Sequence, residues 1–141
     1  MVETVTDKKH IDKFYTWLKP RADVDLEVST SSYIGFEEDS KILGAIFFSN
    51  YDTHNIFIHL ALDNPKICQK KNIRLMFDYI FNQAKCKRVT ATCDNSRNRI
   101  KKLVENVGFK KEGLIRSMVN RNNKNIDVVV YGMLNNECRW I

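Results

Sequence analysis

A histidine in a strand-like stretch of the sequence is well placed for proton transfer. The stretch "IFIHLALD" (residues 56–63) puts His59 between Ile58 and Leu60. Because successive side chains of a strand point to opposite faces, His59 is expected to face away from these two apolar neighbours. Its ordinary pKa of about 6.5 suits a base that acts directly or through a water molecule. A structural histidine bonded to a neighbouring strand fits the same pattern, so both interpretations stay open.

A cluster of basic residues stands where a helical pattern begins. The sequence "CQKKNIRLMF" (residues 68–77) carries Lys70, Lys71 and Arg74 at that point. Cations at a helix N-terminus oppose the helix dipole by about 0.3 to 1 kcal/mol each, so their placement favours a phosphate group close by. The alternative interpretation is a solvated first turn without a ligand.

The four cysteines show no spacing typical of a metal site or a disulfide framework. Successive cysteines lie 18, 7 and 45 positions apart, and no C-x-x-C pair occurs among Cys68, Cys86, Cys93 and Cys138. We therefore expect reduced thiols that pack in the interior, and we expect no metal.

An amphipathic helix is expected near the N-terminus. Ile11, Phe14 and Leu18 keep helical spacing and predict this helix. Thr6 is a candidate N-cap, and Pro20 is expected to end the helix. A second helix is expected to end near Cys86.

The remaining pattern alternates strands and helices. A third helix is expected from about Ser96 to Val107, with Gly108 as its C-terminal cap. The order is strand, helix, three strands, helix, strand, helix, two strands. It predicts an α/β (α+β) protein with a mixed sheet of about six to seven strands, helices on both faces and at least one parallel pair. The expected strands are residues 3–6, 32–38, 41–49, 56–63, 88–93, 112–120 and 125–134.

Length and composition restrict the class of protein further. The chain has 141 residues, of which 43% are hydrophobic, so we expect one globular domain over residues 1–141. No apolar run reaches the roughly 18 residues that a membrane helix needs, and the first residues do not resemble a signal peptide, so a cytoplasmic protein is expected. The formal charge of +6 suits nucleic acid, an acidic partner or a polyphosphate ligand.

This order of elements, together with "CDNSRNRIKKLVENVGFKKEGLIR" (residues 93–116), resembles the GNAT superfamily of acyl-CoA-dependent N-acyltransferases. The resemblance covers about residues 30–134. Its segment "GFKKEG" (residues 108–113) is close to the form seen in ribosomal-protein N-terminal acetyltransferases. The ending "YGMLNNECRW" (residues 131–140) is similar to small acetyltransferase-like proteins of bacteriophages, which would place the protein in the host cytoplasm.

The resemblance implies a sheet that splays between its fourth and fifth strands, with the pantetheine of acetyl-CoA in the gap. Residues 56–63 and 88–93 would be these strands. The backbone of Leu60, Ala61 and Leu62 is then expected to contact the cofactor. Unpaired N–H groups near Leu60 and Leu62 would bond to pantetheine and polarise the thioester carbonyl.

The resemblance also implies a Gln/Arg-x-x-Gly-x-Gly/Ala loop that holds the pyrophosphate. The matching sequence is "QKKNIR" (residues 69–74), in which Asn72 and Arg74 replace the glycines. Asn72 is expected to make the turn in a left-handed conformation, and the three cations compensate with charge. Asn95 or Asn98 matches the family's cofactor-contacting asparagine, and either one is alternatively a cap of the third helix. The loop residues expected to bind cofactor are Gln69, Lys70, Lys71, Asn72, Ile73 and Arg74.

Acyl transfer to an amine requires a base and a proton source for the departing thiolate. His59 is the expected base. The tyrosine that many family members carry in their last helix is absent from "LVEN" (residues 103–106). Tyr131 or Cys93 is the candidate substitute, with simple packing as the alternative for both.

The leading hypothesis is an N-acetyltransferase that moves an acetyl group from acetyl-CoA to a primary amine of a protein N-terminus, a lysine or a small amine. A GNAT-fold binding module without turnover is the alternative. Nucleic-acid binding through the basic residues 97–111 is a third and weaker hypothesis, since no recognition motif accompanies them. Trp140, expected to be exposed, is a candidate contact of a homodimer.

Overall fold

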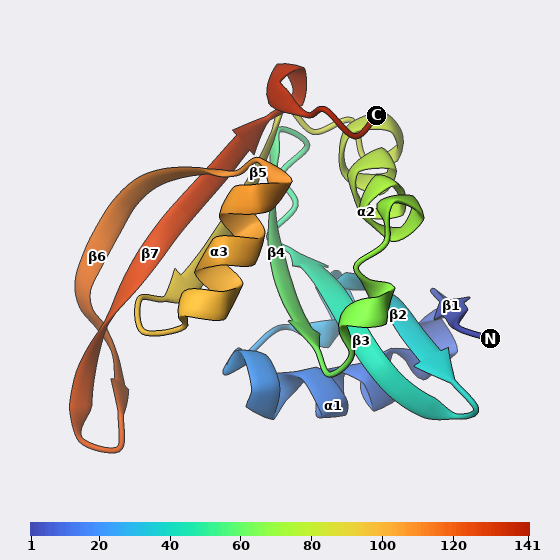
Figure 1. The fold of residues 1–141 in the computed structure, drawn as a ribbon, viewed down its shortest axis with the longest axis horizontal. Coiled ribbons are helices and arrows are strands. Elements are labelled where there is room, and N and C mark those ends of the chain that lie inside the picture. Colours follow the sequence, from blue (N-terminus) through green and yellow to red (C-terminus); the bar gives the residue numbers. More distant parts are fainter.

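The computed structural model describes residues 1–141 and contains one sheet of seven strands (Figure 1). The helices are α1 (Ile11–Ala22), α2 (Lys70–Phe77) and α3 (Asn98–Val107). The strands are β1 (Glu3–Val5), β2 (Ser32–Glu38), β3 (Lys41–Ser49), β4 (Asn55–Leu62), β5 (Arg88–Asp94), β6 (Lys110–Arg121) and β7 (Lys124–Leu134).

The sheet is mixed, in the strand order β1-β2-β3-β4-β5-β7-β6. Only β4 and β5 are parallel, because the chain between them crosses over through α2. The predicted α/β fold class and the predicted order of elements are confirmed. None of the helices is both long and apolar enough to cross a membrane.

The ends of α1 differ from the sequence prediction. Pro20 lies inside the helix, which continues to Ala22 and ends where Asp23 adopts a left-handed conformation with φ of 53°. Proline in the last turn removes only one backbone donor, and the left-handed residue supplies the actual stop. At the other end, the side chain of Asp7 caps a short 3-10 turn that leads into α1, so Thr6 is not the cap.

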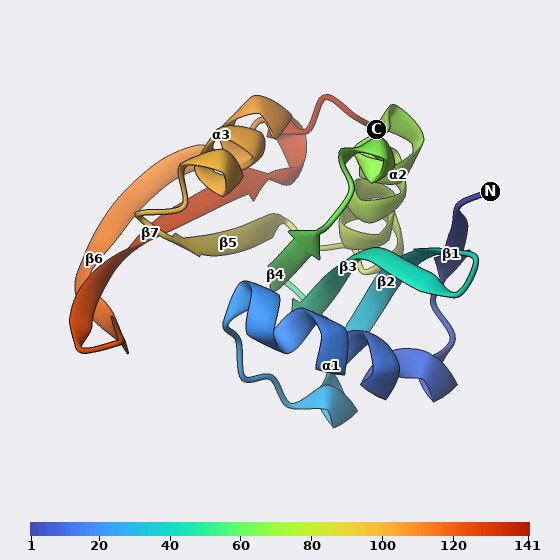
Figure 2. The same ribbon diagram turned by 60° about the horizontal axis from the view of Figure 1, so that its bottom comes forward.

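The helices cover the two faces of the sheet, with α1 on one face and α2 and α3 on the other (Figure 2). On the first face, Phe14 of α1 packs directly over Gly35 of β2, where a Cβ atom would come within 2.3 Å of the ring. The larger core lies on the opposite face. It is built from the apolar stripe of α2 and of the π-helical segment Asp78–Gln83 that continues it, from Val104 of α3, and from apolar side chains of all the long strands except β6.

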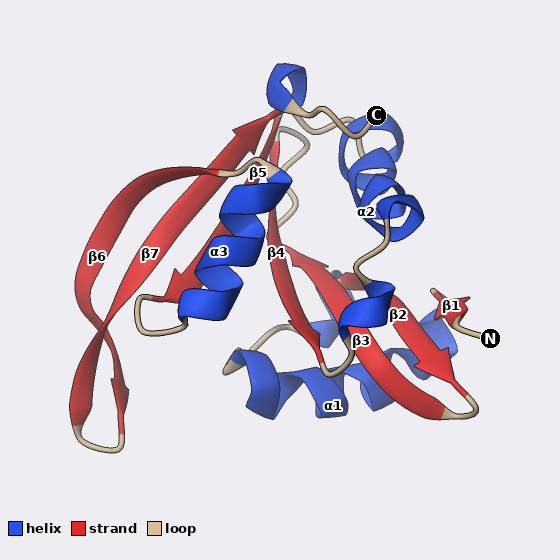
Figure 3. Ribbon diagram, viewed as in Figure 1, coloured by secondary structure: helices blue, strands red, loops and turns tan.

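The sheet splays between β4 and β5, as predicted. The two strands pair only from Asn55 with Arg88 to Ile58 with Ala91. Beyond these residues they diverge, and Figure 3 shows them close together at one end and apart at the other. The divergence opens the sheet between α1, α2 and α3, which is where the candidate site lies.

Candidate active site

The end of β4 presents backbone groups that have no partner strand. The N–H of Asp63 donates to the carbonyl of Leu43 in β3 at 2.8 Å. Because backbone groups alternate in direction along a strand, those of Leu60 and Leu62 point to the opposite side, toward β5. The β4–β5 ladder has already ended at Ile58. The backbone of Ala61, in contrast, points to β3, so Ala61 offers no N–H to the gap.

An apolar cleft lies against this part of β4, on the side of α2 and α3. Its cavity volume is about 90 Å³, and nearly all of its lining is hydrophobic. Such a lining next to free backbone donors suits an uncharged arm that carries amide or carbonyl groups. The lining includes Leu60, Ala61 and Leu62 of β4, Ile73 and Met76 of α2, and Leu103 and Val107 of α3.

A second cavity, here called the cationic vestibule, adjoins the apolar cleft. Its volume is about 950 Å³, and it shares Leu62, Cys68 and Leu103 with the cleft. Residues 63–68 form one side and the first turns of α3 form the other. The vestibule is lined from α3 and the segment before it by Ser96, Arg97, Asn98, Arg99, Ile100, Lys102, Leu103 and Asn106.

The sequence links these α3 cations only to a weak nucleic-acid hypothesis and does not reveal their place beside the cleft. A signal was present, because Arg99, Lys102, Leu103 and Asn106 follow the three- and four-residue spacing of one helix face. What the sequence alone lacked was the position of residues 63–68 opposite this face.

The start of α2 differs from the predicted loop. Gln69 is its N-cap residue, but the Gln69 side chain makes no capping hydrogen bond. Asn72 is not in a left-handed turn: it lies within the helix and its Nδ2 donates to the carbonyl of Ile67 at 2.8 Å. An asparagine side chain here closes the preceding turn instead of opening the backbone to a ligand.

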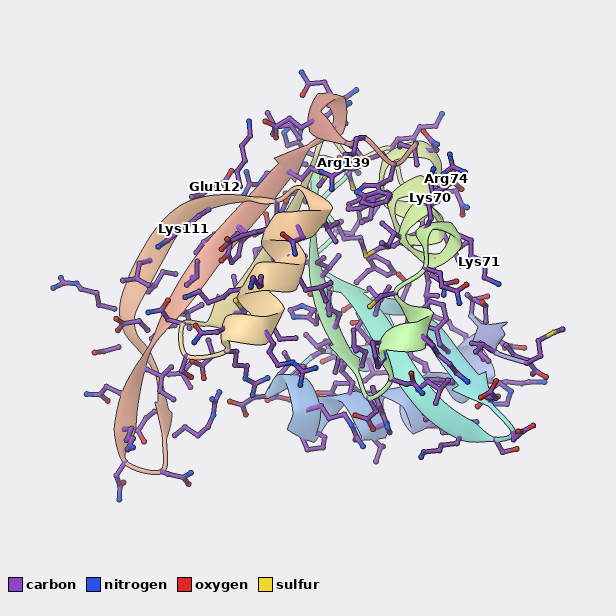
Figure 4. The ribbon with its side chains drawn as sticks, viewed as in Figure 1. Lys70, Lys71, Arg74, Lys111, Glu112 and Arg139 are labelled. Atoms are coloured by element: carbon purple, nitrogen blue, oxygen red, sulfur yellow. The ribbon has the colours of Figure 1, made fainter.

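The basic residues of α2 do not line the cleft or the vestibule (Figure 4). Lys70 and Lys71 are exposed. The Nε of Arg74 donates to the backbone carbonyl of Trp140 at 3.1 Å. Arg74 therefore holds the C-terminal segment in this structure, and of the three cations only the two lysines are free of a protein partner.

Trp140 is not the exposed contact that the sequence suggested. Its side chain is half-buried against the large core, and its Nε1 donates to the carbonyl of Val107 at 2.8 Å. Residues 138–141 thus connect α2 with the end of α3. No further observation supports a homodimer contact at this residue.

His59 lies on the opposite face of the sheet from the apolar cleft, as its alternation predicted. It borders two cavities on the α1 side: one runs along the gap toward Cys93 and Tyr131, and the other is a polar hollow beside Ser49. Its Nε2 is 2.7 Å from the hydroxyl of Ser49. Burial lowers the pKa of His59 to about 4, so the imidazole is neutral at pH 7.

Tyr131 is buried in β7, and its phenol reaches α3. The hydroxyl donates to Oε2 of Glu105 at 2.5 Å. Burial, followed by the neighbouring Glu105 carboxylate, raises the pKa of Tyr131 well above its ordinary value. Glu105 belongs to the "LVEN" sequence where the resemblance led us to expect a tyrosine. The phenol of Tyr131 therefore lies beside this part of α3, although Tyr131 belongs to β7.

The other candidate residues have separate environments. Burial raises the pKa of the Cys93 thiol, which borders the same gap as Tyr131. The carbonyl and side-chain oxygens of Asn95 accept hydrogen bonds from Lys101 Nζ at 3.1 and 2.9 Å. Asn98 is the first residue of α3 and lines the vestibule. Neither asparagine caps α3, whose N-cap residue is Arg97.

Ion pairs connect the two sides of the gap on the α1 face. The Nε of Arg121, near the end of β6, donates to Asp23 Oδ2 at 3.0 Å, and its Nη1 pairs with Asp94 of β5. Arg97 donates to the carbonyl of Arg21 at 2.7 Å. The end of α1 is thereby linked to β5, to β6 and to the residue before α3.

Neither a protein-family model nor a curated protein matches this sequence. Solved structures do match. A probable acetyltransferase is 16% identical to this chain and matches its structure with a TM-score of 0.74. The match covers 96% of this chain and 94% of that one. Mutant forms of the spermidine/spermine N-acetyltransferase SpeG from Vibrio cholerae are 13% identical to this chain and match its structure with a TM-score of 0.76. The match covers 96% of this chain and 94% of that one.

A third match is the ribosomal-protein-S5-alanine acetyltransferase from Vibrio fischeri, with 14% identity and a TM-score of 0.73 over 99% of this chain and 95% of that one. At such identities the likeness establishes the fold alone. The fold is that of the GNAT acetyltransferases, with the splayed parallel pair β4 and β5.

Proposed function

We propose that this protein is an N-acyltransferase that moves an acetyl group from acetyl-CoA to a primary amine. The observation that carries the proposal is the gap between β4 and β5. There the free backbone groups of Leu60 and Leu62 separate an apolar cleft on one face from a cavity that contains His59 on the other. An acyl donor and an amine acceptor can approach the same carbonyl from these two sides.

The donor is proposed to lie with its pantetheine in the apolar cleft. The N–H groups of Leu60 and Leu62 bond to its amides and to the thioester oxygen, where negative charge develops in the transition state. The amine nitrogen attacks the thioester carbon, the C–N bond forms, and the C–S bond breaks to release the thiolate of CoA. Asn98, which lines the vestibule, is proposed as a further contact of the donor. Gln69, Lys70 and Lys71 follow Cys68 of the cleft in the chain and remain proposed contacts, although they do not line the cleft.

His59 is proposed as the base. It is neutral at pH 7 because burial lowers its pKa to about 4. A base of this strength does not deprotonate a free ammonium efficiently. It can take the proton from the nitrogen after attack, because the nitrogen of the tetrahedral intermediate is far more acidic. The Ser49 hydroxyl, 2.7 Å from Nε2, fixes the orientation of the ring.

Tyr131 is proposed to return a proton to the thiolate. Its raised pKa keeps the phenol protonated at all ordinary pH values. The Glu105 carboxylate accepts the hydrogen bond of the phenol in the resting protein. After each turnover a proton from solvent can return to the phenolate through Glu105, which is exposed.

A GNAT-fold binding module without turnover is the second candidate. The observation that favours it is the start of α2, where Asn72 and Arg74 are both engaged by protein groups. Such a module would bind an acyl-CoA and leave it intact.

Incubation of the protein with acetyl-CoA and a panel of amines tests the proposal. The panel should contain peptides with free N-termini, lysine peptides and polyamines, and mass spectrometry should detect the acetylated product alongside released CoA thiol. We expect a product with at least one class of amine. Binding of acetyl-CoA without any product would favour the binding module, and the absence of binding would refute the proposal.

A further inference from the structure

Two cations on one face of α3 have no partner in the protein. Arg99 and Lys102 line the cationic vestibule and are one helical turn apart. Basic residues next to them are engaged: Lys101 donates to Asn95 and Arg97 donates to the carbonyl of Arg21. Neither Arg99 nor Lys102 forms an ion pair, so both head groups are available to an anion.

The vestibule is connected to the proposed acyl site. Leu62, Cys68 and Leu103 belong to both the vestibule and the apolar cleft. A ligand that places an uncharged arm in the cleft therefore has its other end in the vestibule. The cavity of about 950 Å³ has room for a nucleotide.

We propose that Arg99 and Lys102 bind the 3′-phosphate of the ADP part of acyl-CoA and make the protein select CoA over 3′-dephospho-CoA. This inference rests on the proposed function. A terminal phosphate monoester carries a charge of about −1.5 to −2 at pH 7 and three acceptor oxygens. A guanidinium and an ammonium one turn apart provide charge-assisted hydrogen bonds to such a group.

The assignment accounts for the changed loop before α2. Without glycines, and with Asn72 bonded to Ile67, that loop offers little bare backbone to a phosphate. Arg74 is held by Trp140. Recognition of phosphate then depends on side chains, and the free cations that line the vestibule are those of α3.

Titration calorimetry of the full chain with CoA and with 3′-dephospho-CoA tests the inference. The wild type should bind CoA about tenfold or more tightly than the dephospho form, the effect of one charged hydrogen bond or more. The double variant Arg99→Ala/Lys102→Ala should bind both ligands alike, with its affinity for 3′-dephospho-CoA close to that of the wild type.

The matched control is the double variant Lys111→Ala/Arg116→Ala. It removes the same charge from two exposed positions on β6 that do not line the vestibule, and it should keep the preference for CoA. Figure 4 labels Lys111. Equal binding of both ligands by the wild type would overturn the inference. So would an equal loss for both ligands in the α3 variant, which would assign the cations to the diphosphate. If neither ligand binds the wild type, the proposed function fails as well.

Discussion

His59 illustrates how burial changes what one residue can do. Strand alternation predicts its face correctly, but the ordinary pKa of about 6.5 does not apply to a side chain that is buried between two cavities. Desolvation disfavours the charged ring and lowers the pKa to about 4. At neutral pH the imidazole of His59 is therefore unprotonated and can accept a proton, but it is a weak base.

We predict that His59→Gln lowers turnover by about 100-fold or more and leaves the affinity for acetyl-CoA unchanged, because only the proton transfer is removed. In the wild type, kcat divided by the fraction of neutral amine should stay constant as the pH falls through 6.5 and should decline only near pH 4, where the ring becomes protonated. Steady-state kinetics between pH 4 and 8 in a stable buffer series measures both effects. A decline centred at pH 6.5 would show that another group is the base.

The proposed role of Tyr131 depends on its hydrogen-bond partner, Glu105. We predict that Tyr131→Phe lowers kcat by about 100-fold, the lower end of what a positioned acid contributes, and changes the KM for acetyl-CoA little. Stopped-flow detection of thiol release, with acyl-CoA analogues of different thiol pKa, provides the measurement. Analogues with a better leaving group should be less affected by the substitution. An equal loss with every analogue would indicate that the hydroxyl serves only to hold Glu105.

At the scale of elements, the periodicities of the sequence determined most of the fold. The strands were located correctly from their apolar patterns, including β2 and β3, which are buried on both faces. The helix predicted to end near Cys86 is α-helical only to Phe77 and continues as a π-helix to Gln83. The end of α1 was misplaced because Asp23, in a left-handed conformation, stops the helix after Pro20. The vestibule was missed for another reason: it is created by α3 and residues 63–68, which only the folded chain brings together.

The contact between α1 and β2 is so close that the addition of one methyl group at Gly35 tests it. In Gly35→Ala the new Cβ would meet the ring of Phe14 at 2.3 Å, so the helix must shift or the core must repack. We predict a loss of about 1 to 3 kcal/mol in the free energy of unfolding. Gly113→Ala is the matched control, because no atom lies within 4 Å of its added Cβ. Urea denaturation should separate the two variants, and equal stability would refute the close packing of α1.

At the scale of the whole molecule, the gap divides the sheet into two parts. These parts are paired with each other only through a short parallel ladder, while one hydrophobic core cluster spans both. One part contains β1 to β4 with α1 and α2, and the other contains β5 to β7 with α3. Polar contacts outside the sheet also connect them. On the side of the apolar cleft Trp140 joins Arg74 of α2 to Val107 of α3, and on the α1 side Arg121 joins Asp23 to Asp94.

The Arg121 connection should contribute to stability in a pH-dependent way. Asp94 is buried, which by itself would raise its pKa, but hydrogen bonds from Ser96 and the Arg121 guanidinium together lower it. A carboxyl whose pKa is lower in the folded state stabilises the protein above its unfolded pKa of about 3.9. That contribution is lost as the pH falls below this value, because protonation then breaks the pair.

We therefore predict that Arg121→Ala lowers the free energy of unfolding by about 1 to 3 kcal/mol at pH 7, since it leaves the buried Asp94 carboxylate without its cation. The difference from the wild type should shrink as the pH is lowered from 5 to 3.5, because Asp94 of the variant, which has lost its cation, is protonated before Asp94 of the wild type. Arg116→Ala, an exposed residue of the same strand without an ion pair, is the control and should change stability by less than about 0.5 kcal/mol. Chemical denaturation of the three proteins at pH 7, 5 and 3.5 provides the comparison. A difference that stays constant with pH would mean that the aliphatic part of Arg121, and not its charge, holds the two parts of the molecule together.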